Sequence, residues 1–407
     1  MHEDTDVVIV GGSVAGCALA TLLGRQGVRA TVLEKSTSDD HYKVVCTHFI
    51  QPGATPVIER LGLAGPMERA GAVRNGLHLW TDAGWYRTPS DGAYGYNLRR
   101  SKLDPMLRDL AAGTPDVDVR RGVAVGALLR DASGRPSGVL GRTAAGEEVE
   151  VRAKVVVGAD GRGSTVARLA GIPGRVLAHN RFGYMAYFED LPLENEDHRS
   201  LFWFADGGRD ILYAFPNDDG VTVLATFLHK DRLARFKADK EGEFLGAFEG
   251  LERRPPIEQA RRISPLIGKI EMPNVSRPAA RSGVAFVGDA AQASDPLWGV
   301  GVGFAFQSAQ WLADEVAGPL LAGTDVDAGL ERYHRTHRRQ LRGHHLMMSD
   351  FASGRRLNPL ERMIHRAAVR DPQTARMAHE LGARDRPVTH VMRPRRLARA
   401  MVMAATR

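Results

Sequence analysis

One stretch near the start of the chain, DVVIVGGSVAGCALATLLGRQGVRATVLEKS, most narrows what these 407 residues can fold into. An apolar run from Asp6 to Val10 predicts a strand, and after a glycine turn the residues from about Val14 to Gln26 predict a helix. A second apolar run ends at Glu34. Strand, turn, helix and strand in this order predict a βαβ unit, and hence a parallel sheet in an α/β fold.

The turn of this unit is suited to a dinucleotide. It fits the spacing G-x-G-x-x-G, except that Ser13 stands where the middle glycine belongs. Unpaired N–H groups and the dipole at the helix N-terminus favour a pyrophosphate there. Glu34 follows about 20 residues on, where a carboxylate binds ribose hydroxyls and disfavours a 2′-phosphate. The unit therefore predicts FAD or NAD, and not NADP. The expected binding residues are Gly11, Gly12, Ser13, Val14, Ala15, Gly16, Glu34 and Lys35.

Two later strands end in the same way. The apolar residues Val155 to Val157 lead into Asp160 and Gly161, and Ser164 can cap the helix that follows. The stretch GVAFVGDAAQ predicts a strand ending at Gly288 and Asp289, followed by a helix with glycines at its start. The chain thus holds three strand ends with polar, glycine-bearing exits.

In this order and at these separations, the three motifs resemble the class A flavoprotein monooxygenases, the para-hydroxybenzoate hydroxylase-like family. The resemblance covers about the first 330 residues. It implies that the first turn holds the FAD pyrophosphate and that the late turn holds the flavin end. Asp289 would accept hydrogen bonds from ribityl hydroxyls, and the N–H groups around Gly299, Val300 and Gly301 would stabilise the anionic reduced flavin.

The resemblance also implies roles for residues outside the turns. Arg100, in NLRRSKLDPMLRDLA, matches an arginine that pairs with the FAD pyrophosphate. Arg99 is the alternative residue for this role. The alternative interpretation is that both arginines are solvated surface residues without a cofactor role. Lys43 stands where an arginine often lies close to the cofactor, and Val125 stands on the strand that passes the adenine. Pro296 matches the proline beside the reacting ring.

The chain departs from the family pattern at several positions. Gln292 replaces the usual histidine after the Gly-Asp-Ala-Ala motif, and Gly303 replaces an asparagine near the helix start. Ser308 stands at a usually acidic position, and Ala167 at a common arginine, with Arg168 directly after it. These departures, with Ser13, bear on how flavin and NAD(P)H are held.

Between about Arg181 and His229 the sequence consists of short aromatic and β-branched runs separated by turns, which predict an antiparallel sheet. In the family such a sheet covers the flavin and forms the substrate pocket. Tyr213 is the pocket residue we choose, although any one of these aromatics suits plain core. The resemblance implies that the loop with His48 and Gln51 lies close to the flavin, so His48 could orient a substrate or a proton, or be structural.

The expected organisation is a Rossmann-like FAD-binding domain with an inserted antiparallel substrate domain and a C-terminal helical segment. The FAD-binding domain comprises residues 1–75, 99–173 and 280–330, the substrate-binding domain 76–98 and 174–279, and the helical region 331–407. The last region is amphipathic and rich in arginine; we expect it to pack on the domain, with membrane contact as the alternative.

Composition excludes several other classes. The net charge of +7 comes from basic residues spread along the chain with a concentration after Tyr333, so we expect no nucleic-acid partner. Cys17 and Cys46 match no metal spacing, are expected to be buried and inert, and suit a reducing cytoplasm. The one apolar stretch long enough to span a membrane runs from Val7 to Gly24, and Gly11, Gly12 and Gly16 interrupt it. No basic leader precedes this stretch.

The predicted function is an FAD-dependent monooxygenase acting on an electron-rich aromatic or polyketide-like molecule. The resemblance implies NADPH or NADH as a transient reductant, and O2 that adds at the flavin C4a position as a hydroperoxide. Alternatives are a flavin reductase of the geranylgeranyl-reductase type, a halogenase-related enzyme, or a non-catalytic flavin-binding protein. The Trp-x-Trp-x-Ile-Pro motif of the halogenases is absent from this sequence.

Overall fold

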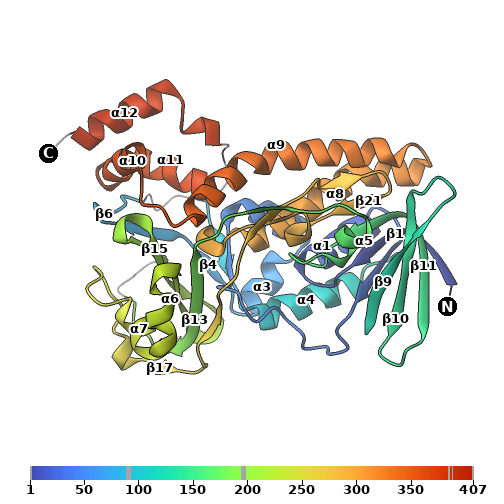
Figure 1. The fold of residues 1–407 in the computed structure, drawn as a ribbon, viewed down its shortest axis with the longest axis horizontal. Helices are drawn as coiled ribbons and strands as arrows, with labels where there is room; N and C mark the ends of the chain where they lie inside the picture. The colour runs from blue at the N-terminus through green and yellow to red at the C-terminus, as the bar shows by residue number, and fades with distance from the viewer. Residues whose placement is uncertain (1, 89–92, 194–198, 384–385, 387, 406–407) are drawn as a thin grey trace.

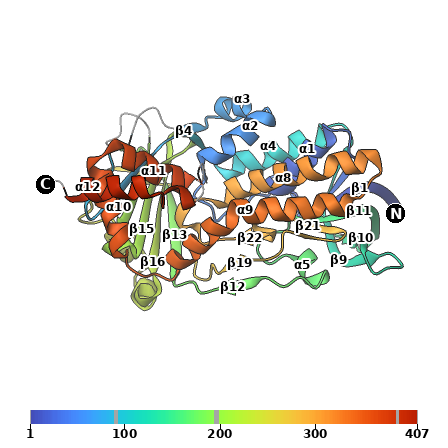
Figure 2. The same cartoon turned by 90° about the horizontal axis from the view of Figure 1, so that it is seen from above.

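The computed structural model describes residues 2–88, 93–193, 199–383, 386 and 388–405. Two eight-stranded sheets lie at opposite ends of an elongated molecule, and a long helix runs between them along one side (Figure 1). The same view turned by 90° shows the helices from Pro359 onward gathered at the end far from the N-terminus (Figure 2).

The first sheet has a parallel centre. Its strand order is β20-β21-β11-β1-β2-β8, and β1 lies parallel to both β2 and β11, while β9 and β10 extend it as an antiparallel meander. The strands are β1 (His2–Val10), β2 (Ala30–Glu34), β8 (Val117–Arg121), β9 (Val123–Arg130), β10 (Pro136–Thr143), β11 (Glu148–Gly158), β20 (Ala280–Arg281) and β21 (Val284–Phe286).

The predicted βαβ unit is formed by β1, helix α1 (Val14–Gly24) and β2. The helix ends at Gly24, two residues before the expected Gln26, because the chain turns there to enter β2. Every residue of α1 is buried, since α4 (Arg100–Ala112) and α8 (Gly301–Ala322) pack against it on the sheet. An apolar helix of this kind requires cover all round, so α1 lies at the centre of the molecule.

The second sheet has the order β17-β13-β16-β15-β14-β5-β6, with β18 also paired to β13. Its strands are antiparallel, as predicted between Arg181 and His229, apart from the parallel pair β14 and β5. The strands are β5 (Leu77–Thr81), β6 (Gly84–Trp85), β13 (Arg181–Glu189), β14 (Ser200–Ala205), β15 (Asp210–Pro216), β16 (Val221–His229), β17 (Arg261–Arg262) and β18 (Ile267–Lys269).

Both faces of this second sheet are buried. Along β14, Phe202 and Phe204 belong to one apolar cluster while Leu201 and Trp203 belong to another. Alternation along a strand sends neighbours to opposite faces, and each face therefore needs its own cover. Short helices α6 (Leu233–Ala238) and α7 (Lys240–Gly246) supply Phe236 and Phe244 to the second cluster.

Two three-stranded sheets, three short α-helices and a 3-10 turn connect these layers. One small sheet contains β3 (Phe49–Ile50), β7 (Gly95–Asn97) and β4 (Val73–Asn75), and the other contains β12 (Arg175–Leu177), β19 (Asn274–Ser276) and β22 (Gln292–Ala293). The helices are α2 (Thr55–Arg60), α3 (Ala64–Arg69), α5 (Thr165–Leu169) and the 3-10 turn η7 (Pro296–Trp298).

The C-terminal region is helical, beginning slightly before the expected Leu330. Its helices are α9 (Val326–Ala352), α10 (Pro359–Arg370), α11 (Pro372–Ala383) and α12 (Pro394–Ala405). Within the parts of the chain just given, no helix is long and apolar enough to cross a membrane. Cys17 is buried as expected, whereas Cys46 is partly exposed because it stands in an open loop.

A buried arginine joins the second sheet to the end of α9. Arg181, wholly inaccessible to solvent, donates to the carbonyl oxygens of Arg209 at 2.8 Å, Phe351 at 2.5 Å and Gly208 at 3.1 Å. Burial lowers the pKa of this guanidinium, although Asp295 opposes the shift. Three carbonyls depend on one side chain, so its loss would leave them without donors.

We therefore expect Arg181→Met to destabilise the protein by about 3 kcal/mol, the cost of leaving buried acceptors unpaired. Urea unfolding followed by circular dichroism measures the change. Arg261→Met, which removes an exposed arginine from the same sheet, is the control and should cost less than about 1 kcal/mol. Equal losses for the two variants would contradict the role given to Arg181.

Candidate functional site

The first glycine turn is tightly built. Gly11 has φ of +112°, and a Cβ there would lie 2.5 Å from the carbonyl oxygen of Ala159 on the neighbouring strand end, so no other residue fits. The buried Glu34 carboxylate accepts from Gly12 N at 2.8 Å and from Ser36 N at 2.9 Å. Glu34 thus lies directly beside the turn, while Lys35 is exposed. The remaining turn residues, Val14, Ala15 and Gly16, form the buried first turn of α1.

A cation lies at the N-terminus of α1. Ser13 makes no side-chain capping bond, and its Oγ instead accepts from Arg100 Nη2 at 2.8 Å. Arg100 is 4% exposed and is held by both oxygens of Asp104, at 2.5 and 2.8 Å. Burial lowers the pKa of Arg100, but the Asp104 carboxylate raises it further, so the charge is retained. A positive charge at a helix N-terminus is unfavourable unless an anion lies there too.

Arg99 takes a different direction from its neighbour. Its guanidinium pairs with Asp218 and Asp219 on the loop between β15 and β16, at 2.7 and 2.5 Å. Lys102 joins the same pair of carboxylates. Of the two arginines proposed for the pyrophosphate, only Arg100 lies at the glycine turn.

The late glycine motif forms a second cradle beside the first. Lys43 Nζ lies 3.2 Å from an oxygen of Asp289. Burial raises the pKa of Asp289, but Lys43 and Arg162 lower it more, which keeps the carboxylate ionised. Helix α8 begins at Gly301 without a side-chain cap, whereas α9 and α10 begin with capping side chains from Asp325 and Asn358. Its first N–H groups therefore remain available for a ligand.

Gly299 closes this cradle. It adopts the left-handed conformation with φ of +61°, and a Cβ there would lie 2.9 Å from the Phe49 ring. Val300 follows it as the buried N-cap residue of α8. Pro296 starts the preceding turn η7, and Tyr213 donates its hydroxyl proton to the Leu297 carbonyl of that turn. Tyr213 is fully buried beneath η7 and is not among the residues lining the adjacent cavity described below.

The middle motif is used for local structure. Asp160 accepts from Ser164 Oγ at 2.6 Å and from Val166 N at 3.0 Å, and Ser164 caps α5 as predicted. Gly161 has φ of +79° with open space where a Cβ would be. Val125, half-buried, lies on β9 opposite Gly141 of β10.

His48 lies buried between the two cradles and the second sheet. Its Nδ1 accepts from the backbone N–H of Arg100 at 3.1 Å, so its Nε2 carries the proton and donates to Tyr187 Oη at 2.7 Å. Burial first, and the Arg100 charge second, lower the pKa of His48 to about 3. The imidazole is therefore neutral at physiological pH. Tyr187, on β13, was missed from the sequence because one aromatic in a strand resembles any other.

A cavity of about 460 Å³ opens next to the late cradle. Gln51 Nε2 donates to the Trp298 carbonyl at 2.5 Å and joins the loop after His48 to this wall. The buried indole Nε1–H of Trp298 has no acceptor among the described residues. The lining includes Phe49, Gln51, Asn75, Leu77, Leu79, Arg199, Phe202, Phe215, Trp298 and, from α11, Arg376, Ala378, His379, Glu380 and Gly382.

The family departures have structural counterparts. Ser308 Oγ accepts from Gly288 N at 2.9 Å and so fixes the late motif from α8. Gly303 is a buried residue of the same helix, and Gln292 is buried on β22. Ala167 N donates to the Ser164 cap at 3.0 Å. None of these residues interrupts either cradle.

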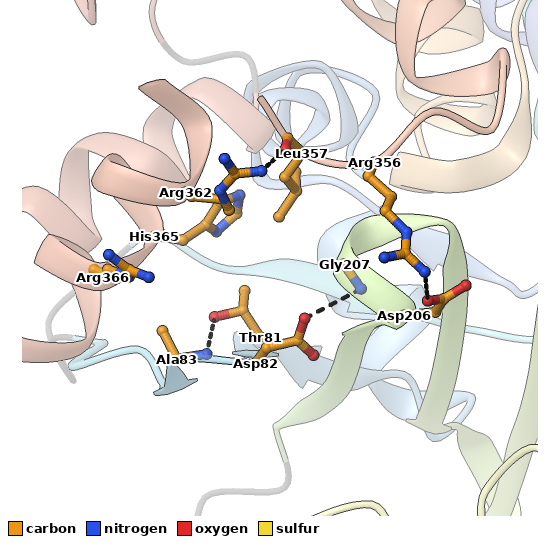
Figure 3. Close-up of a pocket in the computed structure, with 10 residues that line it drawn as sticks. All are labelled: Thr81, Asp82, Ala83, Asp206, Gly207, Arg356, Leu357, Arg362, His365 and Arg366. Atoms are coloured by element: carbon orange, nitrogen blue, oxygen red, sulfur yellow. Dashed lines mark hydrogen bonds and ion pairs between the residues drawn. The ribbon is translucent and has the colours of Figure 1, made fainter. Parts of the chain in front are cut away.

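A second cavity, of about 350 Å³, lies under α10 at the far side of the second sheet (Figure 3). Arg356 pairs with Asp206 at 2.7 Å across its rim, and Asp82 accepts from Gly207 N at 3.1 Å. None of the predicted site residues lines this cavity. No group of three or more potential metal ligands occurs among the residues the structure describes.

Fold and site together define a flavoprotein of the dinucleotide-binding type. Two glycine cradles at neighbouring helix N-termini, with Arg100 and Lys43 beside them, fit a long anionic cofactor. Residues 4–349 match the FAD binding domain family, and the chain belongs to that family. FAD is accordingly its cofactor, and the resemblance to flavoprotein monooxygenases is confirmed.

Three proteins with similar sequences illustrate the range of activities among the relatives of this chain. A 6-methylpretetramide 4-monooxygenase of Streptomyces rimosus is 29% identical, covering 75% of this chain and 73% of its own. A 3-amino-4-hydroxybenzoate 2-monooxygenase, PtmB3, of Streptomyces platensis is 29% identical, covering 84% and 89%. A digeranylgeranylglycerophospholipid reductase of Thermoplasma volcanium is 25% identical, covering 76% and 77%. The flavin-dependent brominase Bmp2 shares the fold, with a TM-score of 0.78 at 19% identity and 94% coverage of both chains.

The two adjacent arginines allow a matched test of cofactor binding. We expect Arg100→Met to weaken FAD binding by at least tenfold, because a charge-assisted hydrogen bond is worth about 1.5–3 kcal/mol. Arg99→Met should change FAD affinity by less than about threefold, because its guanidinium is paired elsewhere. Titration of the apoprotein with FAD, followed by flavin fluorescence, measures both. A larger effect for Arg99 would reverse the assignment.

The depressed pKa of His48 predicts an acid-sensitive fold. The folded pKa of about 3 lies below the ordinary 6.5, so protons bind the unfolded chain preferentially between these values. The stabilisation is complete above about pH 6.5 and decreases by up to about 1.4 kcal/mol per pH unit as pH falls. Replacing His48 with Gln should make unfolding free energy less steep between pH 7 and 5. An unchanged slope in urea titrations at those pH values would contradict this.

Proposed function

We propose that this flavoprotein monooxygenase hydroxylates an electron-rich aromatic molecule bound in the cavity beside Trp298, using NAD(P)H and O2. The cavity carries the proposal, since its walls are formed by the late glycine turn and by aromatic residues of the second sheet. When bound, FAD accepts electrons from NAD(P)H and delivers them to O2. The protein residues then bind, orient and exclude water.

The cavity walls suit a planar apolar molecule. Phe49, Phe202, Phe215 and Trp298 line it, with Leu79 from β5. Aromatic walls with a few polar groups are the usual composition of such sites, and water exclusion prevents wasteful loss of a reactive oxygen species. The unpaired Nε1–H of Trp298 supplies a donor for a substrate oxygen, since buried donors are normally paired.

The charged rim of the cavity indicates what the molecule carries. Arg74, Arg199 and Arg376 line it against one acid, Glu380. Arg74 is exposed and lies over the Tyr94 ring at 4.6 Å, and Arg199 is buried. Arg74 is paired with Glu68 at 2.7 Å, and we propose that the buried Arg199 favours a substrate with a phenolate, enolate or carboxylate group.

We assign His48 a positioning role. The neutral imidazole links the Arg100 backbone to the Tyr187 hydroxyl, and thus connects the pyrophosphate arginine to the second sheet. A pKa of about 3 prevents it from serving as a cationic acid at neutral pH. Pro296 and Tyr213 act by shaping η7, which presents Trp298 to the cavity.

On this proposal, the domain division made from the sequence corresponds to two tasks. Residues 1–75, 99–173 and 280–330 hold FAD, while residues 76–98 and 174–279 form most of the substrate cavity. The helical region 331–407 contributes one wall through α11. The free thiols of Cys17 and Cys46 suit a reducing compartment, and we place the enzyme in the cytoplasm.

A reductase is the second candidate, favoured by the digeranylgeranylglycerophospholipid reductase among the relatives. An apolar cavity can also hold an isoprenoid chain. The two reactions differ in their products, since a monooxygenase adds one oxygen atom from O2 and a reductase adds two hydrogen atoms.

The FAD-loaded enzyme should therefore be incubated with NADPH or NADH under ¹⁸O2, using a panel of phenolic and polycyclic aromatic compounds. We expect a product carrying one ¹⁸O atom, detected by mass spectrometry. Anaerobic reduction of an isoprenoid double bond, with no oxygen incorporated from any compound, would replace this proposal by the reductase one.

Trp298→Phe tests the substrate donor on the same assay. The variant keeps an aromatic wall but loses the N–H, so KM for the accepted compound should rise about fivefold, the value of one hydrogen bond near 1 kcal/mol. Trp311→Phe, in α8 facing α9 and away from the cavity lining, should leave KM unchanged. A rise for both variants would point to general destabilisation.

A further inference from the structure

Helix α12 has apolar side chains on both its inner and its outer side. Ala400 is fully buried, and Leu397 and Met403 are partly buried. Ala398, Met401, Val402 and Ala405 point outward and are exposed, Met401 by 53% and Val402 by 59%. Arg399, whose side chain is 42% exposed, pairs with Asp371, with contacts of 2.7 Å to both carboxylate oxygens. Surface helices normally turn the polar side to water. An apolar stripe facing outward therefore calls for a covering surface.

The stripe continues beyond the helix and is bordered by positive charge. Met392, two residues before α12, is 51% exposed, and Arg393 and Arg395 beside it are exposed. Arg396, on the inner side, approaches Glu380 of α11 at 3.9 Å. Both views show α12 at the outer edge of the end opposite the N-terminus, with α10 beneath it (Figures 1 and 2).

The whole C-terminal region shares this charge. Residues 331–407 contain 18 arginines and no lysine against six acidic residues, so the preceding residues carry net negative charge in a chain of +7. Five of these arginines lie on α9, which runs back along the molecule toward the N-terminus, and the other 13 follow it, where residues 353–407 hold four acidic residues. The positive charge is therefore densest at the end that carries α12. Such a field attracts an anionic surface and repels another copy of itself.

We propose that α12, with Met392, docks on an anionic lipid bilayer. The outward methionine and valine side chains would enter the boundary between headgroups and acyl chains, and Arg393 and Arg395 would lie at the headgroup phosphates. A symmetric contact with a second copy is disfavoured because it opposes two arginine-rich ends. A specific protein partner needs about 800 Å² on each side, more than one short helix stripe offers, and no α12 residue lines either cavity.

Docking there would bring the catalytic cavity close to the membrane. Helix α11, which lies next to α12 in the chain and joins it through Glu380 and Arg396, forms one wall of that cavity. An apolar aromatic substrate dissolved in the bilayer would then reach the cavity along this wall. The docking itself does not depend on the proposed function, since it is measured without turnover.

Sedimentation of the FAD-loaded protein with sucrose-filled vesicles tests the proposal. We expect binding to vesicles of phosphatidylglycerol and phosphatidylcholine at low salt, and at least tenfold weaker binding to phosphatidylcholine alone. Met401→Glu with Val402→Glu should reduce binding to the anionic vesicles at least tenfold. Leu321→Glu, at a side chain 57% exposed on α8, is the matched control and should bind as the wild type does.

Three results would overturn the proposal. They are absence of wild-type binding to anionic vesicles at low salt, equal loss for Leu321→Glu, and salt-sensitive capture of an acidic protein without vesicle binding. If the double variant loses FAD or unfolds at a lower temperature, Arg393→Glu with Arg395→Glu replaces it. The same tenfold loss is expected, because these exposed arginines carry no ion pair among the described residues.

Discussion

The Arg100 guanidinium is the interaction on which the site depends. It is buried at the start of α4, is neutralised by Asp104, and reaches Ser13 at the N-terminus of α1. Its backbone N–H holds His48, and His48 holds Tyr187 on the second sheet. A single residue thus ties the dinucleotide turn to the sheet that forms the cavity. The guanidinium and the helix dipole both favour the anionic cofactor at this position.

The sequence predicted the first sheet and its turns well because their physics is local. A glycine at position 11 is required by a positive φ and by a carbonyl oxygen 2.5 Å from where a Cβ would be. Ser164 caps α5 through a contact three residues away. Signals of this kind can be read from a short window, and the order of three such windows was enough to indicate the family.

The rest of the site could not be predicted, because it depends on contacts between distant segments. Tyr187 meets His48 from 139 residues away, and Trp298 acquires its role from neighbours on β14 and α11. Arg99 is distinguished from Arg100 by its ion pairs with Asp218 and Asp219, which no local sequence pattern connects to either arginine. We chose Tyr213 from the sequence as a pocket residue, but in the structure its hydroxyl donates a hydrogen bond to the Leu297 carbonyl of η7.

The C-terminal helices show why charge and burial must be considered together. Amphipathicity alone indicated that α12 has one apolar side, and packing on the domain was the expected use of it. In the structure α12 does pack on α10, with Ala400 fully buried, and the ion pair between Arg399 and Asp371 adds to this attachment, while Met401 and Val402 remain exposed on the outer side. A helix with apolar side chains on two sides can bury one side and expose the other, and α11, which contacts α12 and lines the cavity, then connects attachment to access.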